Sequence, residues 1–159
     1  MDSHADLPVA GRSATIVYRT GRHVNVSGFT DQIGKPINVE IVHALVMCEC
    51  PYTGEVYKLQ LSNALDIQSI DCCLIHPIMM RLAGVLVDEC PKFLSSRPSV
   101  ENYSIYFPKE SLRIPLLLDG IITCILCRKP SHNEANDETI ITLDLTPNCN
   151  AWDPHNPEY

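Results

Sequence analysis

The first residues of this chain that could do chemistry are a carboxylate and a hydroxyl, Asp2 and Ser3, in the run Asp2-Ser3-His4-Ala5-Asp6. Two carboxylates held close together cannot both ionise, so one keeps a proton and can act as an acid while the other acts as a base. Such a pair can activate a water molecule for attack on a carbonyl carbon. Asp2 would need a second carboxylate facing it.

A second acidic candidate is Asp119, which follows Leu117-Leu118 and precedes Gly120. Asp2 is followed by Ser3, whereas no Thr or Ser follows Asp119. Asp and Gly are both common turn residues. We therefore predict a turn between two strands at this point and assign it no catalytic role.

Thiols are the other chemically active groups. The spacings Cys124-x-x-Cys127 and Cys48-x-Cys50 occur in zinc sites. In a strand, however, Cys124 and Cys127 would point to opposite faces. We expect free thiols buried as small apolar groups, no metal and no cofactor, with a zinc site and disulfides as the alternatives. The chain has eight cysteines, at positions 48, 50, 72, 73, 90, 124, 127 and 149.

Most of the chain predicts β-strands that alternate with turns. The turn Pro51–Gly54 predicts a β-hairpin. Pro77 suits the first turn of a helix and Gly84 its C-terminal end, which predicts one short helix near 77–83 with His76 at its start. Residues 131–138 are polar and predict a loop. The predicted strands are 14–18, 23–27, 38–50, 55–61, 72–75, 85–87, 103–107, 112–118, 121–127 and 139–145.

Composition excludes several classes of protein. A hydrophobic fraction of 45% and a charged fraction of 19% are typical of a globular domain. The net charge of −7 argues against binding to nucleic acid, which favours a basic surface. No apolar run approaches the roughly 18 residues that a membrane span requires, so we expect no membrane partner. The N-terminus shows no secretory signal, and we expect a cytoplasmic protein.

The order of short motifs along the chain resembles the protease-like region of copia-type retrotransposon polyproteins. Asp2-Ser3-His4-Ala5 resembles the active-site turn Asp-Thr/Ser-Gly-Ala of retroviral-type aspartic proteases. Further segments that resemble the family are 20–29, 53–57, 63–65, 74–84, 104–107, 112–116, 120–121, 128–130, 145–147 and 152–155.

This resemblance implies a retropepsin-like (acid protease) β domain that works as a homodimer. Asp2 would be the catalytic residue, and the Asp2 of a second copy would supply the second carboxylate. The hydroxyl of Ser3 would brace the turn across the dimer, and Ala5 would pack beneath it. Leu74 and Ile75 would form the apolar wall behind the turn, and the hairpin 51–55 would be a flap. The substrate would be a peptide of the element's own polyprotein.

His4 departs from the family pattern, which has Gly at this position. Gly adopts positive φ without steric cost, whereas His there strains the turn. An imidazolium beside Asp2 would also lower the pKa of Asp2 and oppose the shared proton. In addition, Asp2 has no preceding strand in this chain. We therefore expect an N-terminally truncated and inactive form.

The sequence thus predicts a single mainly β domain, with a retropepsin-like core over 1–90, an additional β segment over 91–147 that packs on the same domain, and a tail over 148–159. The expected function is that of a retrotransposon-derived aspartic endopeptidase domain that processes a polyprotein, in an inactive form. The alternative is a non-catalytic β interaction module that pairs its exposed strands with partner chains.

Overall fold

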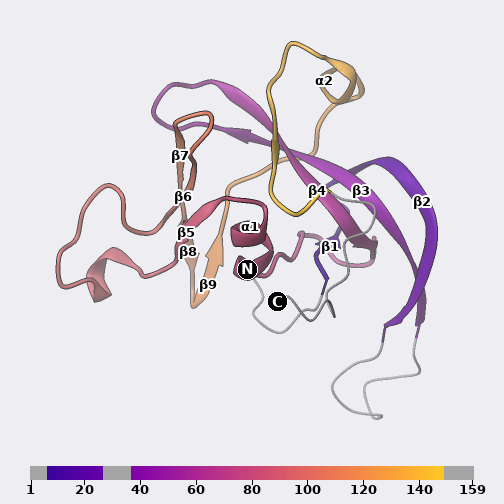
Figure 1. Cartoon of the computed structure of the whole chain (residues 1–159), viewed down its shortest axis with the longest axis horizontal. Coiled ribbons are helices and arrows are strands. Elements are labelled where there is room, and N and C mark those ends of the chain that lie inside the picture. The colour runs from indigo at the N-terminus through magenta and orange to yellow at the C-terminus, as the bar shows by residue number, and fades with distance from the viewer. Residues whose placement is uncertain (1–6, 27–36, 149–159) are drawn as a thin grey trace.

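A computed structural model describes residues 7–26 and 37–148 of the chain (Figure 1). These residues are mainly β, as predicted, with two short α-helices and one 3-10 helix, η2 (Lys92–Leu94). Figure 1 shows the three longest strands curving together on one side of the molecule, the short strands β5 to β9 on the other, and α1 between them.

The main sheet is built on three antiparallel neighbours, and two short strands complete it. β4 lies beside β3, and β3 beside β2. The other edge of β4 is shared, because β10 pairs in parallel with its first half and β1 pairs in parallel with its last residues. The strands of this sheet are β1 (Val9–Ala10), β2 (Thr15–Val26), β3 (Ile37–Glu49), β4 (Val56–Asp66) and β10 (Thr142–Asp144).

The predicted β-hairpin between β3 and β4 is confirmed. The backbone N–H of Cys50 donates to the carbonyl of Glu55 over 2.8 Å, and the N–H of Gly54 donates to the carbonyl of Cys50 over 2.8 Å. Gly54 has a φ of 72°, a value that a residue without Cβ adopts at no steric cost. The local sequence Pro51–Gly54 therefore specifies this turn.

The predicted break between the strands 14–18 and 23–27 is wrong, because β2 runs through Thr20 and Gly21 as a single strand with a bulge. The register changes from Arg19 opposite Val42 to His23 opposite Glu40. Gly21 has a φ of 73°, and the Thr20 hydroxyl donates to the carbonyl of Ile41 over 2.6 Å. A Gly at positive φ serves a turn and a bulge equally well, and the continuous partner β3 decides between them.

A second layer consists of a three-stranded sheet in the order β5-β6-β7 and the separate hairpin β8–β9. Pro115 ends the edge strand β7, because it has no N–H for a further neighbour. The predicted strand 112–118 divides at Leu116 into β7 and β8. The strands are β5 (Leu86–Asp88), β6 (Ser104–Phe107), β7 (Leu112–Pro115), β8 (Leu117–Asp119) and β9 (Ile122–Cys124).

The predicted short helix is α1 (Pro77–Leu82), with its start and end as expected. Pro77 occupies the first turn, and the His76 side chain accepts a hydrogen bond from the N–H of Ile78 over 3.0 Å. Gly84 follows the helix with a φ of 85°. A glycine at positive φ just after the last turn is a common way for a helix to end.

The prediction of a single helix and of a loop at 131–138 is wrong, because α2 (His132–Asn136) forms there. Ser131 and Glu134 make a capping box, in which each side chain accepts a hydrogen bond from the backbone N–H of the other residue. Arg128 pairs with Glu134 over 2.5 Å and lowers the pKa of that carboxyl far below its usual range. The Ser-x-x-Glu signal was present in the sequence.

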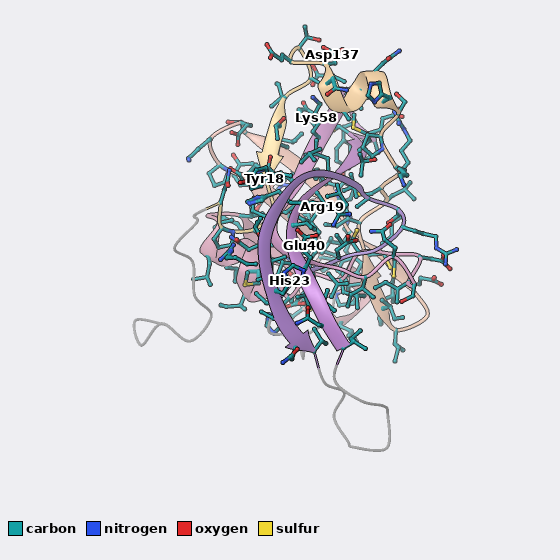
Figure 2. All side chains as sticks on the ribbon, turned by 90° about the vertical axis from the view of Figure 1, so that its right-hand side faces the viewer. Tyr18, Arg19, His23, Glu40, Lys58 and Asp137 are labelled. Carbon is teal, nitrogen blue, oxygen red and sulfur yellow. The ribbon has the colours of Figure 1, made fainter. Side chains whose placement is uncertain are left out.

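A buried lysine of the sheet anchors α2. Lys58 lies in β4 and is only 5% exposed. Its Nζ donates to the carbonyls of Ala135 over 3.1 Å and Asp137 over 2.6 Å, and Figure 2 shows Lys58 directly beneath Asp137. A cation at the carbonyl end of a helix is favourable, so Lys58 satisfies groups that the short helix leaves unpaired.

The core is continuous across both layers. One buried cluster joins Leu59 and Leu61 of β4 to Met80 of α1, Ile105 of β6 and Leu143 of β10. A smaller cluster contains Val9, Val39, Ile41 and Leu65. Neither helix of the described part of the chain has the length and apolar composition that a membrane crossing requires.

Candidate functional site

The predicted active-site turn, Asp2, Ser3, His4 and Ala5, lies outside the described residues. The structure describes the chain that follows it, from Leu7 onward, and both predicted wall residues, Leu74 and Ile75. The candidate site is therefore built from β1, which follows these residues in the sequence, and from the groups that hold β1 in place.

β1 follows the motif closely and lies between two other segments. On one side, the N–H of Leu65 donates to the carbonyl of Pro8 over 2.8 Å, in a parallel pairing with β4. On the other side, Val9 and Leu74 exchange both backbone hydrogen bonds, over 2.8 and 3.0 Å, as an antiparallel bridge. β1 is thus a central strand although it contains only Val9 and Ala10.

Leu74 and Ile75, which follow each other in the sequence, pack into different buried clusters. Leu74 packs against the cluster that contains Val9 and Leu65, and Ile75 is 8% exposed within the main core. Leu7, the first described residue, packs against both clusters. Leu74 therefore lies beside β1 through its backbone bridge with Val9, and Ile75 belongs to the main core. Their contact with the turn itself stays a prediction.

Gly11 follows β1 at a point where the backbone comes very close to the backbone of residues 70–72. A Cβ at Gly11 would lie 2.2 Å from the carbonyl oxygen of Cys72 and 2.8 Å from that of Ile70. The following N–H groups bond the same segment: Arg12 donates to the carbonyl of Ile70 over 2.9 Å and Ser13 to that of Asp71 over 3.2 Å. The absence of a side chain at Gly11 permits this approach.

The sequence analysis missed a polar network that supports β1 from the sheet. The Arg19 guanidinium contacts Glu40 over 2.5 Å and Asp66 over 3.0 Å, and Figure 2 shows Arg19 beside Glu40 on neighbouring strands. Asp66 accepts from the Gln68 amide over 2.8 Å, and the same amide lies 3.4 Å from the carbonyl of Ala10. These residues come from different strands, and no local motif could have joined them.

Within this network, the pKa of Arg19 is raised. The hydrogen bond from Arg19 to Glu40 raises the pKa of the guanidinium, and Asp66 adds to the effect. A guanidinium between two carboxylates neutralises them, whereas an acid–base pair of carboxylates must share a proton. The Arg19 guanidinium therefore holds Glu40 and Asp66 as an ion-paired cluster on neighbouring strands.

His43 lies in β3 as predicted and is 8% exposed. Its ring centroid is 5.5 Å from that of Tyr18. Burial lowers the pKa of His43, and the positive charge of Arg22 lowers it further. His43 is therefore neutral at pH 7 and belongs to the core of the sheet.

Asp119 and the cysteines considered as zinc ligands do not come together in one site in the described part of the chain. Asp119 ends β8 and Gly120 follows it with a φ of 61°, which confirms the predicted turn. Within residues 7–26 and 37–148, no three His, Cys, Asp or Glu side chains gather closely enough to hold a metal ion.

The hairpin predicted as a flap carries a titratable phenol. The Tyr57 hydroxyl donates to the Glu55 carboxylate over 2.6 Å, which raises the pKa of Tyr57 to about 12. Because the folded pKa exceeds the ordinary value of about 10, this stabilisation is complete below about pH 10 and is lost as the pH rises through about 12. In an ultraviolet titration, we expect Tyr57→Phe to remove the phenol that ionises last.

Glu55→Gln is the matched control for this titration. It keeps the shape of the acceptor and removes its charge, so the pKa of Tyr57 should move back toward about 10. If the amplitude that Tyr57→Phe removes is lost near the ordinary pKa of about 10 and Glu55→Gln leaves the curve unchanged, the assignment is contradicted.

Comparison of the chain with protein-family models, with curated protein sequences and with solved structures finds no match.

Proposed function

We propose that this chain is a retropepsin-like aspartic endopeptidase domain of a copia-type retrotransposon polyprotein, in a form with little or no activity. The order of its motifs supports the family, and the mainly β fold agrees with a domain of this type. Its substrate would be a peptide of the element's polyprotein in the cytoplasm.

The observation that carries the proposal is the position of β1. The strand that follows Asp2-Ser3-His4-Ala5 is fixed between β4 and Leu74, and the apolar pair Leu74-Ile75 lies against it. A catalytic turn needs such a rigid base, because a carboxylate must be held within a fraction of an ångström of its working position. The network from Arg19 through Asp66 to Gln68 adds polar support to the same strand.

The chemistry would use Asp2 from each of two copies. One carboxyl would keep its proton and the other would accept a proton from the attacking water. The protonated group would then donate to the nitrogen of the departing amine. Ser3 would brace the turn across the dimer, and Ala5 would pack beneath it.

His4 is the reason for the low activity that we propose. A side chain at this position would strain a turn that favours Gly, and a protonated imidazole there would oppose the shared proton of the two Asp2 carboxyls. Acidic conditions, which the carboxyl pair needs, are also those in which His4 is charged.

Cleavage of a peptide library between about pH 4 and 6, the range in which carboxyl pairs share a proton, tests the proposal with three forms of the chain. We expect little cleavage by the natural sequence, measurable cleavage by His4→Gly, and none by His4→Gly combined with Asp2→Asn. Pepstatin should inhibit the active form. If His4→Gly folds as the natural sequence does and remains silent, the endopeptidase proposal fails.

The second candidate is a non-catalytic β interaction module, and the hairpin β8–β9 favours it. This two-stranded sheet pairs with no other strand of the described residues, and it exposes Leu117 (48%), Ile121 (97%) and Ile122 (56%). Free strand edges with exposed apolar side chains can accept an extended peptide. Capture of an extended apolar peptide that Ile122→Lys abolishes, together with silence of His4→Gly, would favour the module.

A further inference from the structure

Two thiols that are far apart in sequence face each other across an isolated β-bridge. Met47 and Arg128 exchange both backbone hydrogen bonds, over 2.8 and 2.9 Å, in the antiparallel sense. One step along each chain leads to Cys48 and Cys127. In an antiparallel ladder, the pair next to a hydrogen-bonded pair has its Cα atoms about 4.5 Å apart. A disulfide needs a Cα separation of about 4.4 to 6.8 Å, so this position suits one.

The surroundings of the two thiols agree with this register. Cys48 is 2% exposed within the main core, and Cys127 packs against the same core while remaining partly exposed. The hydrogen bond between the two thiols lowers the pKa of Cys48 and raises the pKa of Cys127.

We propose that Cys48 and Cys127 are a redox pair that closes to a disulfide when a hydroperoxide reaches it. The bond would join β3 to the segment after β9, which the backbone bridge between Met47 and Arg128 already holds against β3. It would therefore lock this segment onto the main sheet. The inference is independent of any proteolytic activity.

The reaction balances with hydrogen peroxide as the oxidant. The Cys48 thiolate attacks one peroxide oxygen, the O–O bond breaks, and the departing hydroxide takes a proton to form water. Cys48 is then a sulfenic acid. The sulfur of Cys127 attacks the sulfur of Cys48, the S–O bond breaks, and the hydroxide leaves as water with the proton of Cys127. Two electrons pass from the two sulfurs to the peroxide, and a dithiol reductant reverses the change.

The test uses the full folded chain, treated with hydrogen peroxide, alkylated and digested with trypsin for mass spectrometry. We expect a cross-linked peptide pair that disappears on reduction. Cys50 lies in the same tryptic peptide as Cys48, and Cys124 in the same peptide as Cys127. Cys50→Ser and Cys124→Ser are therefore matched controls that should keep the cross-link, whereas Cys48→Ser and Cys127→Ser should lose it.

Thermal unfolding gives an independent readout. Peroxide should raise the midpoint of the natural chain and of the two controls, and the rise should be absent in Cys127→Ser, whose side chain is partly exposed. The mapping of the natural chain needs no substitution, so misfolding of Cys48→Ser does not affect it. The proposal is overturned if another cysteine pair dominates the cross-links, or if Cys48 and Cys127 are both still alkylated on unfolding after peroxide treatment.

Discussion

Replacing Gly11 by Ala is expected to destabilise the protein by about 3 kcal/mol, the upper end of the usual cost of forcing extra atoms into a packed site. The new Cβ would lie 2.2 Å from the carbonyl oxygen of Cys72 and 2.8 Å from that of Ile70. Both are backbone atoms, which cannot rotate away as a side chain would. β1 and the segment 70–72 would therefore have to separate, with loss of the hydrogen bonds from Arg12 and Ser13.

Urea unfolding followed by circular dichroism measures the loss in free energy of unfolding. In a thermal unfolding experiment, the midpoint should fall by roughly 6 to 12 °C. Gly54→Ala is the control, because its Cβ would meet no atom within 4 Å and only the φ of 72° is unfavourable. That strain costs about 1 kcal/mol. Equal losses for the two substitutions would show that the backbone contact at Gly11 is not as close as the structure has it.

Truncating Ile105 to Ala is expected to remove about 3 kcal/mol from the free energy of unfolding, because buried Ile to Ala changes leave a cavity as well as removing apolar contact. Ile105 is 0% exposed in β6 and belongs to the same buried cluster as Leu59 of β4. It lies in the segment 91–147, for which the sequence predicts an addition to a core over 1–90. The substitution therefore tests whether the two segments unfold together.

A single unfolding transition that moves to lower urea in Ile105→Ala would show one cooperative unit. Two transitions, of which only one moves, would show that residues 91–147 unfold separately. Ile122→Ala is the matched control, since Ile122 is 56% exposed in β9 and should change stability by less than about 0.5 kcal/mol. A large loss in the control would place the β8–β9 hairpin in the cooperative unit as well.

Several elements could be predicted because their signals are local. Pro51–Gly54 specifies the hairpin through its turn residues, and His76-Pro77 with Gly84 specifies α1 through its two ends. The same kind of signal marks the start of α2, where Ser131 and Glu134 form the capping box. The polar composition of 131–138 instead indicates a loop, and here the capping signal is the one that the structure follows. A short polar helix buries little apolar surface, and its caps are the better guide.

The candidate site could be predicted only in part. Leu74 and Ile75 are the predicted apolar wall behind the turn, and their contact with the turn stays a prediction. In the structure, Leu74 pairs with Val9 of β1 and Ile75 belongs to the main core. The network of Arg19, Glu40 and Asp66 was missed, because each residue alone is an ordinary charged position on a strand. Only the pairing of β2, β3 and β4 brings them together.

The sequence by itself determined the mainly β class, the β3–β4 hairpin and the helix α1, since alternation, Pro and Gly act over a few residues. The tertiary structure decided that β2 passes through Gly21 as a bulge, that β1 lies between β4 and Leu74, and that Cys48 faces Cys127. These outcomes depend on which distant strands pair. Pairing is set by the burial of whole faces and not by any short motif, so local residues could not reveal it.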